Sequence, residues 1–433
     1  MLIHMTIGGI DGSYGNIIPY VTSYLKVNSD EEDIGFNLML WIVALFDLGI
    51  AISSNFGGML EKKFGQRATV LVSALVMACG SATSYFSLQQ SFWLWLFTYG
   101  LINGFGMGVA YNTVLVCAMR WLPNHRGFAS GMIQFGYAVG NSIFVATQTA
   151  FVNPQNYEAD SSGYFMKESV LSRVPTLFLL VATMVFVMNI AGCILLISPK
   201  HIRHEHAIVT TPLLSEKELQ ANGVKEVDDD ECNVAPRQVI SSSTFWCLWF
   251  TWICVNQPTN FIISYSKVYG STFIKNDILL TALGSASAVT AGLSRLIWGI
   301  VADKYSYQCA MTYICGLMTL FMSTICLTPY GGPAMYFIWV LIIQFALGGP
   351  FSLCPMAVTN AFGEENAVIN NGLFLSSMGV ATVLSATLTT ILLGALTYCE
   401  MFVLMAAFGF LGLCISVLIH KTKYGNRISS RKK

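Results

Sequence analysis

Long apolar stretches separated by short polar ones make up most of the chain. A run of about 20 apolar residues is long enough to cross the hydrocarbon core of a bilayer as a helix. Runs of this kind lie at residues 2–25, 34–60, 68–88, 92–119, 127–151, 174–198, 243–267, 276–302, 308–329, 333–358, 367–393 and 397–420. The pattern predicts an all-α membrane protein with twelve transmembrane helices.

One long polar segment divides this pattern in two. Residues 199–242 carry a basic stretch around Lys200 and an acidic run at 228–231, which is typical of a solvated linker. The segment separates an N-terminal bundle of six helices (1–198) from a C-terminal bundle of six (243–420), and a basic cytoplasmic tail (421–433) follows. We therefore expect two bundles joined by a cytoplasmic linker.

Short motifs recur in both halves at nearly one offset. Three pairs of matching positions are separated by 241 to 245 residues, namely Gly58 and Gly299, Gly104 and Ala346, and Gly127 and Gly372. Internal repeats of this kind are typical of membrane proteins whose two halves rock around a central site. The repeat predicts that the two bundles are related by pseudo-symmetry.

Composition agrees with a membrane location. Of the 433 residues, 54% are hydrophobic and 11% are charged, whereas soluble proteins carry about 25% charged residues. This balance excludes a disordered chain, a nucleic-acid-binding protein with a basic face and a soluble multidomain enzyme. If the linker and both termini are cytoplasmic, 17 of the 23 Lys and Arg residues lie on that side. The positive-inside rule predicts this orientation, in the plasma membrane or an organelle membrane.

Motifs of enzymes and of cofactor-binding proteins do not occur in the sequence. It contains no P-loop, catalytic triad or dinucleotide fingerprint in a strand–helix context. His201, His204 and His206 have a loose metal-like spacing, but their place in the polar linker favours solvated side chains over a zinc site. We expect no enzymatic activity, no cofactor and no metal, and a protein that works as a monomer in the lipid bilayer.

Three ionisable residues lie deep within the predicted spans: Asp11, Asp47 and Arg295. Insertion of a charge at the middle of the bilayer costs at least about 2.5–3.5 kcal/mol, so each of these residues is expected to have a functional or structural role. Arg295 lies roughly 12 Å from the cytoplasmic end of its helix, and its planar guanidinium suits bidentate capture of a carboxylate. A structural ion pair with Asp11 or Asp47 is the alternative. Both aspartates are candidate proton sites, with inter-helix hydrogen bonding as the other interpretation.

Polar residues in several spans are candidates for the wall of a central cavity. Asn256 and Gln257 precede Pro258, which predicts either an interrupted helix that lines a cavity or a proline kink packed in protein. The further candidates for substrate binding are Tyr14, Asn16, Gln134, Tyr137 and Trp298.

Charged residues cluster in the turns on the predicted cytoplasmic side. Such groups beside helix ends can hold the two halves together and separate when the halves rock apart, or they can serve only to set the topology. The candidate gating residues are Lys62, Lys63, Arg67, Arg120, Arg126, Asp303 and Lys304.

Several of these motifs resemble those of a known family. Gly299, Asp303 and Lys304 match the signature Gly-x-x-x-Asp-basic of the major facilitator superfamily, while in the first half Glu61 lies one place early. The run 120–131, the glycines at 104–108 and the stretch 15–20 look like the oxalate/formate antiporter and monocarboxylate transporter branch. The resemblance covers all the predicted spans and implies a transporter with a major facilitator fold.

The resemblance also implies a role for Arg295. Its Arg-x-x-x-Gly spacing matches the eighth-helix arginine that such transporters use for substrate. Two departures limit this inference. Met378 stands where oxalate transporters have a lysine, so a single cation suits a monoanion better than a dianion. Ala291 replaces the aspartate of monocarboxylate transporters, and the first span has no interior lysine, so proton coupling by that arrangement is not expected.

The sequence therefore predicts a secondary active transporter. Its substrate would be a small organic anion with one carboxylate, carried by alternating access with protons or in exchange for another anion. One alternative is a facilitator for a neutral or zwitterionic solute, in which Arg295 stays in a structural ion pair. A non-transporting membrane sensor or scaffold is the other, although the linker is short for a signalling domain.

Overall fold

The structure is a computed structural model and describes residues 1–28, 39, 41–157, 164–197, 233–392 and 395–429. Within these ranges the regular elements are helices, without strands. The acidic run 228–231 and the linker histidines His201, His204 and His206 lie outside the described residues. An apolar chain with intrahelical hydrogen bonds suits a lipid environment because the backbone needs no partner outside each helix.

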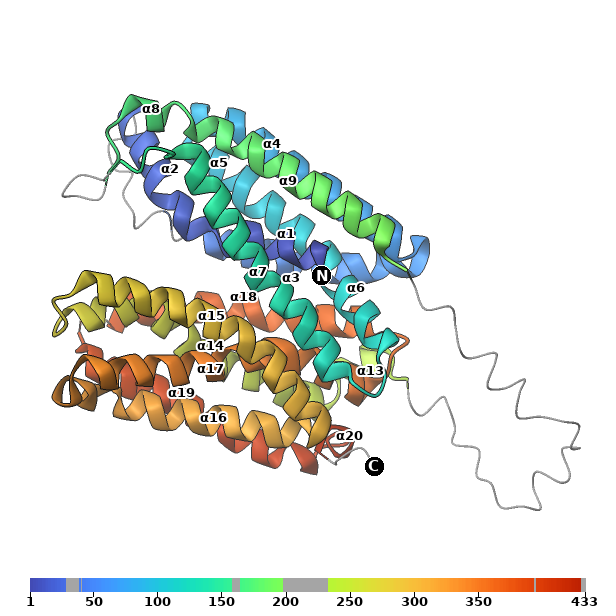
Figure 1. Cartoon of the computed structure of the whole chain (residues 1–433). Helices are drawn as coiled ribbons and strands as arrows, with labels where there is room; N and C mark the ends of the chain where they lie inside the picture. The colour runs from blue at the N-terminus through green and yellow to red at the C-terminus, as the bar shows by residue number, and fades with distance from the viewer. Residues whose placement is uncertain (29–38, 40, 158–163, 198–232, 393–394, 430–433) are drawn as a thin grey trace, which may run out of the picture.

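The helices divide into two groups that lie side by side (Figure 1). The first group contains α1 (Leu2–Asp11), α2 (Tyr14–Asn28), α3 (Trp41–Phe64), α4 (Gln66–Gln90), α5 (Phe92–Trp95), the π-helix η2 (Leu96–Ile102), α6 (Asn103–Trp121), α7 (Arg126–Val152), α8 (Glu168–Leu171) and α9 (Val174–Leu195).

The second group follows the undescribed residues 198–232. It contains α13 (Pro236–Ile240), α14 (Ser243–Ser271), α15 (Asp277–Lys304), α16 (Tyr307–Thr324), the 3-10 helix η4 (Ile325–Leu327), α17 (Thr328–Phe362), α18 (Ala367–Leu392), α19 (Tyr398–Leu418), the 3-10 helix η5 (Ile419–Lys421) and α20 (Asn426–Ser429). We call the helix ends near Ile197 and Asn233, which border the undescribed residues, the linker side.

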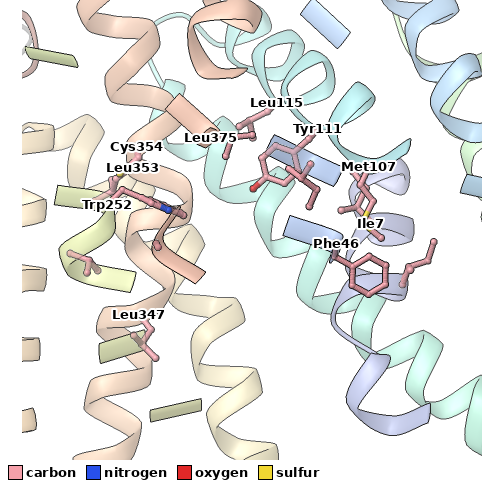
Figure 2. Packing of buried hydrophobic residues seen from close by; sticks show 14 of the residues in the cluster. Ile7, Phe46, Met107, Tyr111, Leu115, Trp252, Leu347, Leu353, Cys354 and Leu375 are labelled. Atoms are coloured by element: carbon pink, nitrogen blue, oxygen red, sulfur yellow. The ribbon is translucent and has the colours of Figure 1, made fainter. Parts of the chain in front are cut away.

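Two helix pairs form most of the contact between the groups: α7 packs against α15, and α3 packs against α18. Small residues permit this close approach, as they do in membrane proteins generally. A Cβ atom on Gly127 would overlap with the backbone of Gly299, and one on Gly372 would press on the backbone of Ser54. Buried apolar residues fill both groups (Figure 2), with Trp252 and Leu353 in one and Tyr111 in the other.

Within the described residues, eight helical stretches are long and apolar enough to cross a membrane. One of them, Tyr307–Phe362, has 56 residues and contains both predicted spans 308–329 and 333–358. The predicted spans 2–25, 127–151 and 243–267 are not among the eight, although the helices α7 and α14 occupy the last two. The structure supports an all-helical membrane protein, and the count of twelve spans in two bundles of six stays a prediction.

Two details concern the continuity of the predicted spans. The predicted span 2–25 is two helices, α1 and α2, separated at Gly12 and Ser13. The amide of Gly12 still donates a hydrogen bond to the backbone oxygen of Gly8 at 2.9 Å. The first bond after the break runs from the amide of Asn16 to the backbone oxygen of Ser13. Of the two alternatives left open at Pro258, the interrupted helix is not formed, because α14 continues from Ser243 to Ser271. A proline can be accommodated in a packed membrane helix because its neighbours satisfy the freed groups.

Candidate functional site

Arg295 lies on α15 with its guanidinium between two aromatic rings. The Cζ atom is 4.8 Å from the ring centre of Tyr137 on α7 and 4.9 Å from that of Phe351 on α17. Nη1 donates a hydrogen bond to the backbone oxygen of Gln134 at 3.2 Å. The buried Nε atom has no hydrogen-bond partner among the described residues. Ring faces and one carbonyl therefore hold this cation.

Room for Arg295 comes from glycines on both neighbouring helices. A Cβ atom on Gly348 of α17 would lie 3.2 Å from Cγ of Arg295 and would overlap with the hydroxyl of Ser294. A Cβ atom on Gly131 of α7 would lie 2.9 Å from Cα of Leu296. The arginine thus sits where α7, α15 and α17 lie close together, at the contact between the two helix groups.

No carboxylate lies within 4 Å of Arg295 in the part of the chain that the structure describes. The two ion pairs found there are Arg120 with Glu61 and Arg126 with Glu364. The structural ion pair that the sequence left open for Arg295, with Asp11 or Asp47, is therefore not formed in this structure. An unneutralised cation inside a membrane protein is costly, so the arrangement favours a site that an anion completes.

Both membrane-embedded aspartates accept a hydrogen bond from a hydroxyl group. The phenol of Tyr137 donates to Asp11 at 2.5 Å, so one ring contacts Arg295 with its face and Asp11 with its hydroxyl. Asp47 is 4% exposed and accepts from the hydroxyl of Thr382 on α18, across the contact between the groups. These are the inter-helix hydrogen bonds that the sequence allowed as an alternative. Their role as proton sites stays a prediction.

Gln134 connects Arg295 with a second buried ring pair. Its side-chain amide donates to the hydroxyl of Tyr111 on α6 at 2.5 Å, while its backbone oxygen accepts from Arg295. The ring of Tyr111 lies 5.0 Å from the ring of His4 on α1. His4 is fully buried, and neither ring nitrogen has a partner among the described residues. The sequence analysis missed His4, although a histidine in an apolar span was a signal.

The other predicted cavity residues connect helices rather than contact Arg295. Asn16 of α2 bonds Gln148 of α7 at 3.3 Å, and Trp298 donates to the backbone oxygen of Phe345 at 2.9 Å. In α14, Gln257 donates to the backbone of α18 at 3.1 Å, and Asn256 beside it is buried. Tyr14 is half-buried at the start of α2. The structure brings Gln134 and Tyr137 to Arg295 and leaves substrate binding by the rest as a prediction.

Comparison with known proteins identifies the family. The family model described as Major Facilitator Superfamily matches residues 1–385 of the chain. The chain belongs to the major facilitator superfamily. This confirms the family expected from the motifs, whose members are non-enzymatic carriers in membranes.

Relatives and solved structures agree with this assignment. Apicoplast pyruvate carrier 1 of Toxoplasma gondii is 26% identical in an alignment that covers 84% of this chain and 77% of the carrier. The oxalate:formate antiporter of Oxalobacter formigenes is 21% identical over 91% of this chain and 86% of the antiporter. The structure of the proton:xylose symporter XylE covers 97% of this chain and 94% of its own, with a TM-score of 0.72 and 14% identity, so it supports the fold.

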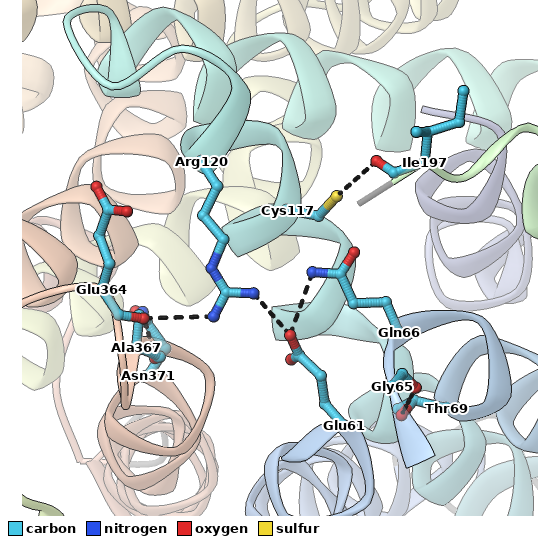
Figure 3. Close-up of polar contacts among 10 residues, drawn as sticks. All are labelled: Glu61, Gly65, Gln66, Thr69, Cys117, Arg120, Ile197, Glu364, Ala367 and Asn371. Carbon is cyan, nitrogen blue, oxygen red and sulfur yellow. Dashed lines mark hydrogen bonds and ion pairs between the residues drawn. The ribbon is translucent and has the colours of Figure 1, made fainter. Parts of the chain in front are cut away.

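Polar contacts join the two helix groups on the linker side. Nη1 of Arg120 donates to Glu61 at 2.8 Å, and Nη2 donates to the backbone oxygen of Glu364 in the turn before α18 at 3.3 Å (Figure 3). Arg126 pairs with the carboxylate of Glu364 and donates to Asn360 at 2.7 Å. Sequence reasoning missed Glu364 because two acids in a turn carry no signature that shows which of them pairs across the helix groups.

The N-terminus of α7 rests on Asp303 of the second group. The two carboxylate oxygens of Asp303 accept from the backbone amides of Gly127 at 2.8 Å and Phe128 at 2.7 Å. An acid at a helix N-terminus satisfies free amides and complements the helix dipole. The close approach of Gly127 and Gly299 beside it brings α7 and α15 together. In this structure the groups are joined on the linker side.

The remaining predicted gating residues differ in what they contact. Lys62 donates to Asn366 at 2.5 Å and so joins the groups. Arg67 donates to the backbone oxygen of Leu196 at 2.8 Å, inside the first group. Lys63 and Lys304 lie over the rings of their own neighbours Phe64 and Tyr305. The structure therefore places four of the predicted residues between the groups: Lys62, Arg120, Arg126 and Asp303.

Proposed function

We propose that the protein is a secondary active transporter of a small organic anion with one carboxylate. Transport proceeds by alternating access, either together with protons or in exchange for another anion. The observation that supports this proposal is the unpaired guanidinium of Arg295 between rings from both helix groups. Asp11 and Asp47 are the proton-site candidates that the sequence offers.

The chemistry of the site favours a monocarboxylate over other solutes. A carboxylate binds a guanidinium through charge-assisted hydrogen bonds, and the free Nε edge of Arg295 is available for one. A single cation neutralises a single negative charge, whereas a dianion would bring an uncompensated charge into the membrane. One relative is named for the monocarboxylate pyruvate, and another is named for the monocarboxylate formate together with the dianion oxalate. The absence of an ion pair at Arg295 among the described residues disfavours the neutral-solute alternative.

The proposal includes an arrangement in the membrane. Residues 1–198 and 243–420 form the two halves, and the linker 199–242 and both termini, including the tail 421–433, lie in the cytoplasm. The linker side is then the cytoplasmic side, and the polar contacts there form the cytoplasmic gate. The excess of Lys and Arg on that side supports this orientation.

Uptake by reconstituted protein tests the proposal. We expect Arg295→Gln and Arg295→Lys to lower pyruvate uptake into proteoliposomes about ten- to hundredfold, since hydrogen bonds to charged groups contribute about 1.5–3 kcal/mol. Lysine lacks the planar fork of arginine and should not substitute for it. Arg237→Gln is the matched control because Arg237 is exposed on α13. Normal uptake by the Arg295 variants, or uptake of neutral analogues only, would refute the anion site.

A further inference from the structure

His4 on α1 is a buried titratable side chain without a hydrogen-bond partner. Its exposure is 0%, and both ring nitrogens lack a partner among the described residues. Buried polar groups are nearly always hydrogen-bonded in folded proteins, so each exception calls for an explanation. A packing role alone would be met by an apolar residue of similar size. The imidazole is therefore available for chemistry, because nothing described in the structure engages either nitrogen.

A short chain of contacts joins His4 to the arginine of the substrate site. The ring of His4 packs on Tyr111 with centres 5.0 Å apart, and Tyr111 accepts a hydrogen bond from the side chain of Gln134. The backbone oxygen of the same glutamine accepts from Arg295. These contacts connect His4 with Arg295 through Tyr111 and Gln134, and the helix of His4 packs against α6, α7 and α9.

The charged groups around His4 include one cation and one carboxylate. The titratable groups in this region are Asp11 on α1 itself, Tyr111 and Cys117 on α6, Tyr137 on α7 and Arg295 on α15, with Cys193 on the packed helix α9. Tyr137 is bonded to Asp11, and Cys193 lies 3.4 Å from the backbone oxygen of Arg67. Burial itself disfavours a charged imidazole, and Arg295 is the cation that the contacts through Tyr111 and Gln134 connect with His4. A proton on His4 is therefore repelled by Arg295 as long as the guanidinium has no anion.

We propose that His4 is the proton-binding site that couples transport of the anion to protons. The inference rests on the proposed function and selects proton symport over exchange. When a carboxylate binds Arg295 it cancels the positive charge that repels the imidazolium, and His4 then takes a proton from water on the open side. One N–H bond forms, and it breaks again when anion and proton leave together on the other side. The transported pair carries no net charge.

The coupling follows from linkage between the two ligands. If the anion favours the proton on His4, the proton favours the anion by the same factor, and such factors are commonly about 5- to 150-fold. Asp11 and Asp47 are less suited to this role because each already accepts a hydroxyl hydrogen bond. Asp47 moreover joins α3 to α18 through Thr382, so its bond contributes to the contact between the helix groups.

Two assays on the same proteoliposomes test this role separately from the proposed function. Exchange of labelled for unlabelled pyruvate at equal pH on both sides needs binding and rocking, but no net proton movement. Accumulation of pyruvate driven by an inward proton gradient needs the coupling site. We expect His4→Gln and His4→Asn to keep exchange and to lose accumulation, and pyruvate-driven proton flux, by about tenfold or more. His420→Gln, which alters an exposed histidine on the linker side, should behave as the unchanged protein.

Each other outcome overturns the inference. Gradient-driven accumulation by both His4 variants at the rate of the unchanged protein would do so. The His4 variants could lose both exchange and accumulation while pyruvate still raises their melting temperature. That result would show that His4 is needed for the rocking of the halves and not for proton binding. Loss of accumulation in Asp11→Asn or Asp47→Asn alone, with exchange kept, would place the proton on a carboxylate. Exchange without pyruvate-driven proton flux in the unchanged protein would also refute it, whereas absence of both activities for any monocarboxylate would refute the proposed function.

Discussion

The contact between Gly127 and Gly299 allows a direct test of the closed linker side. These glycines lie where α7 and α15 meet, beside the backbone amides that donate hydrogen bonds to Asp303. A Cβ atom on Gly299 would overlap with the backbone oxygen of Gly127 and would lie 2.7 Å from its carbonyl carbon and 3.3 Å from the amide nitrogen of Phe128. These are backbone atoms, which cannot rotate aside as a side chain can. The change Gly299→Ala should therefore push the two helices apart.

The size of the effect follows from the packing. Adding a methyl group to a filled contact costs about 1–3 kcal/mol. In the alternating-access cycle that we propose, α7 and α15 separate at the linker side, so this penalty applies only to the conformation in which they touch there. The same free energy therefore shifts the equilibrium toward the conformation that is open on that side, by a factor of about 5 to 150.

Hydrogen exchange of a single segment measures this shift. The amides of Gly127 and Phe128 are protected by Asp303 of the other helix group, so their exchange reports on separation at this point. We expect faster exchange in residues 126–131 of the Gly299→Ala protein. The matched control is Gly284→Ala in the same helix, since a Cβ atom there would meet nothing within 4 Å. Equal exchange in both variants would show that α7 and α15 are not in tight contact and would refute the reasoning.

Two further changes test contacts between the helix groups. Glu364→Gln removes the ion pair with Arg126 on the linker side but keeps the backbone oxygen that Arg120 contacts. Hydrogen exchange in residues 126–131 should therefore become faster at low salt, and less so at high salt, because salt screens the ion pair. An equal effect of Glu365→Gln, which changes the exposed neighbour, would contradict this. Thr382→Val leaves the buried carboxylate of Asp47 without its hydroxyl donor, which should lower stability by about 1–3 kcal/mol in thermal unfolding. Thr387→Val, at an exposed position of the same helix, should have no such effect, and equal melting temperatures would disprove the role of the bond.

Much of the fold could be predicted because lipid imposes one strong requirement. A spanning segment must be apolar and helical, so apolar runs alone locate helices without any knowledge of their partners. The predicted span 367–393 corresponds to α18 at Ala367–Leu392, and 127–151 corresponds to α7. The same reasoning failed where the backbone changes course inside an apolar run. The break between α1 and α2 falls at Gly12 and Ser13, directly after Asp11, inside a run that was read as one span, and the proline in α14 does not interrupt its helix.

The site was predictable only in part. Arg295 could be found by its depth, because a cation in an apolar run is costly wherever its partners lie. The ring of Phe351 could not be found, because one phenylalanine among many apolar residues carries no signal of a cation above its face. Contacts between the halves were likewise hidden. Asp303 was a candidate for holding the halves together, but its partner, the N-terminus of α7, was not predicted because sequence alone does not show which helix ends meet.

The position of Arg295 connects binding with movement. Its two ring contacts come from different helix groups, since Tyr137 belongs to α7 and Phe351 to α17. If the groups rock apart, at least one ring must leave the guanidinium, and the cation loses part of the environment that stabilises it. A bound carboxylate compensates for that loss because it travels with the arginine. An anion that binds Arg295 in both conformations therefore lowers the cost of the intermediate states between them, and this links occupancy of the site to the rate at which the halves exchange.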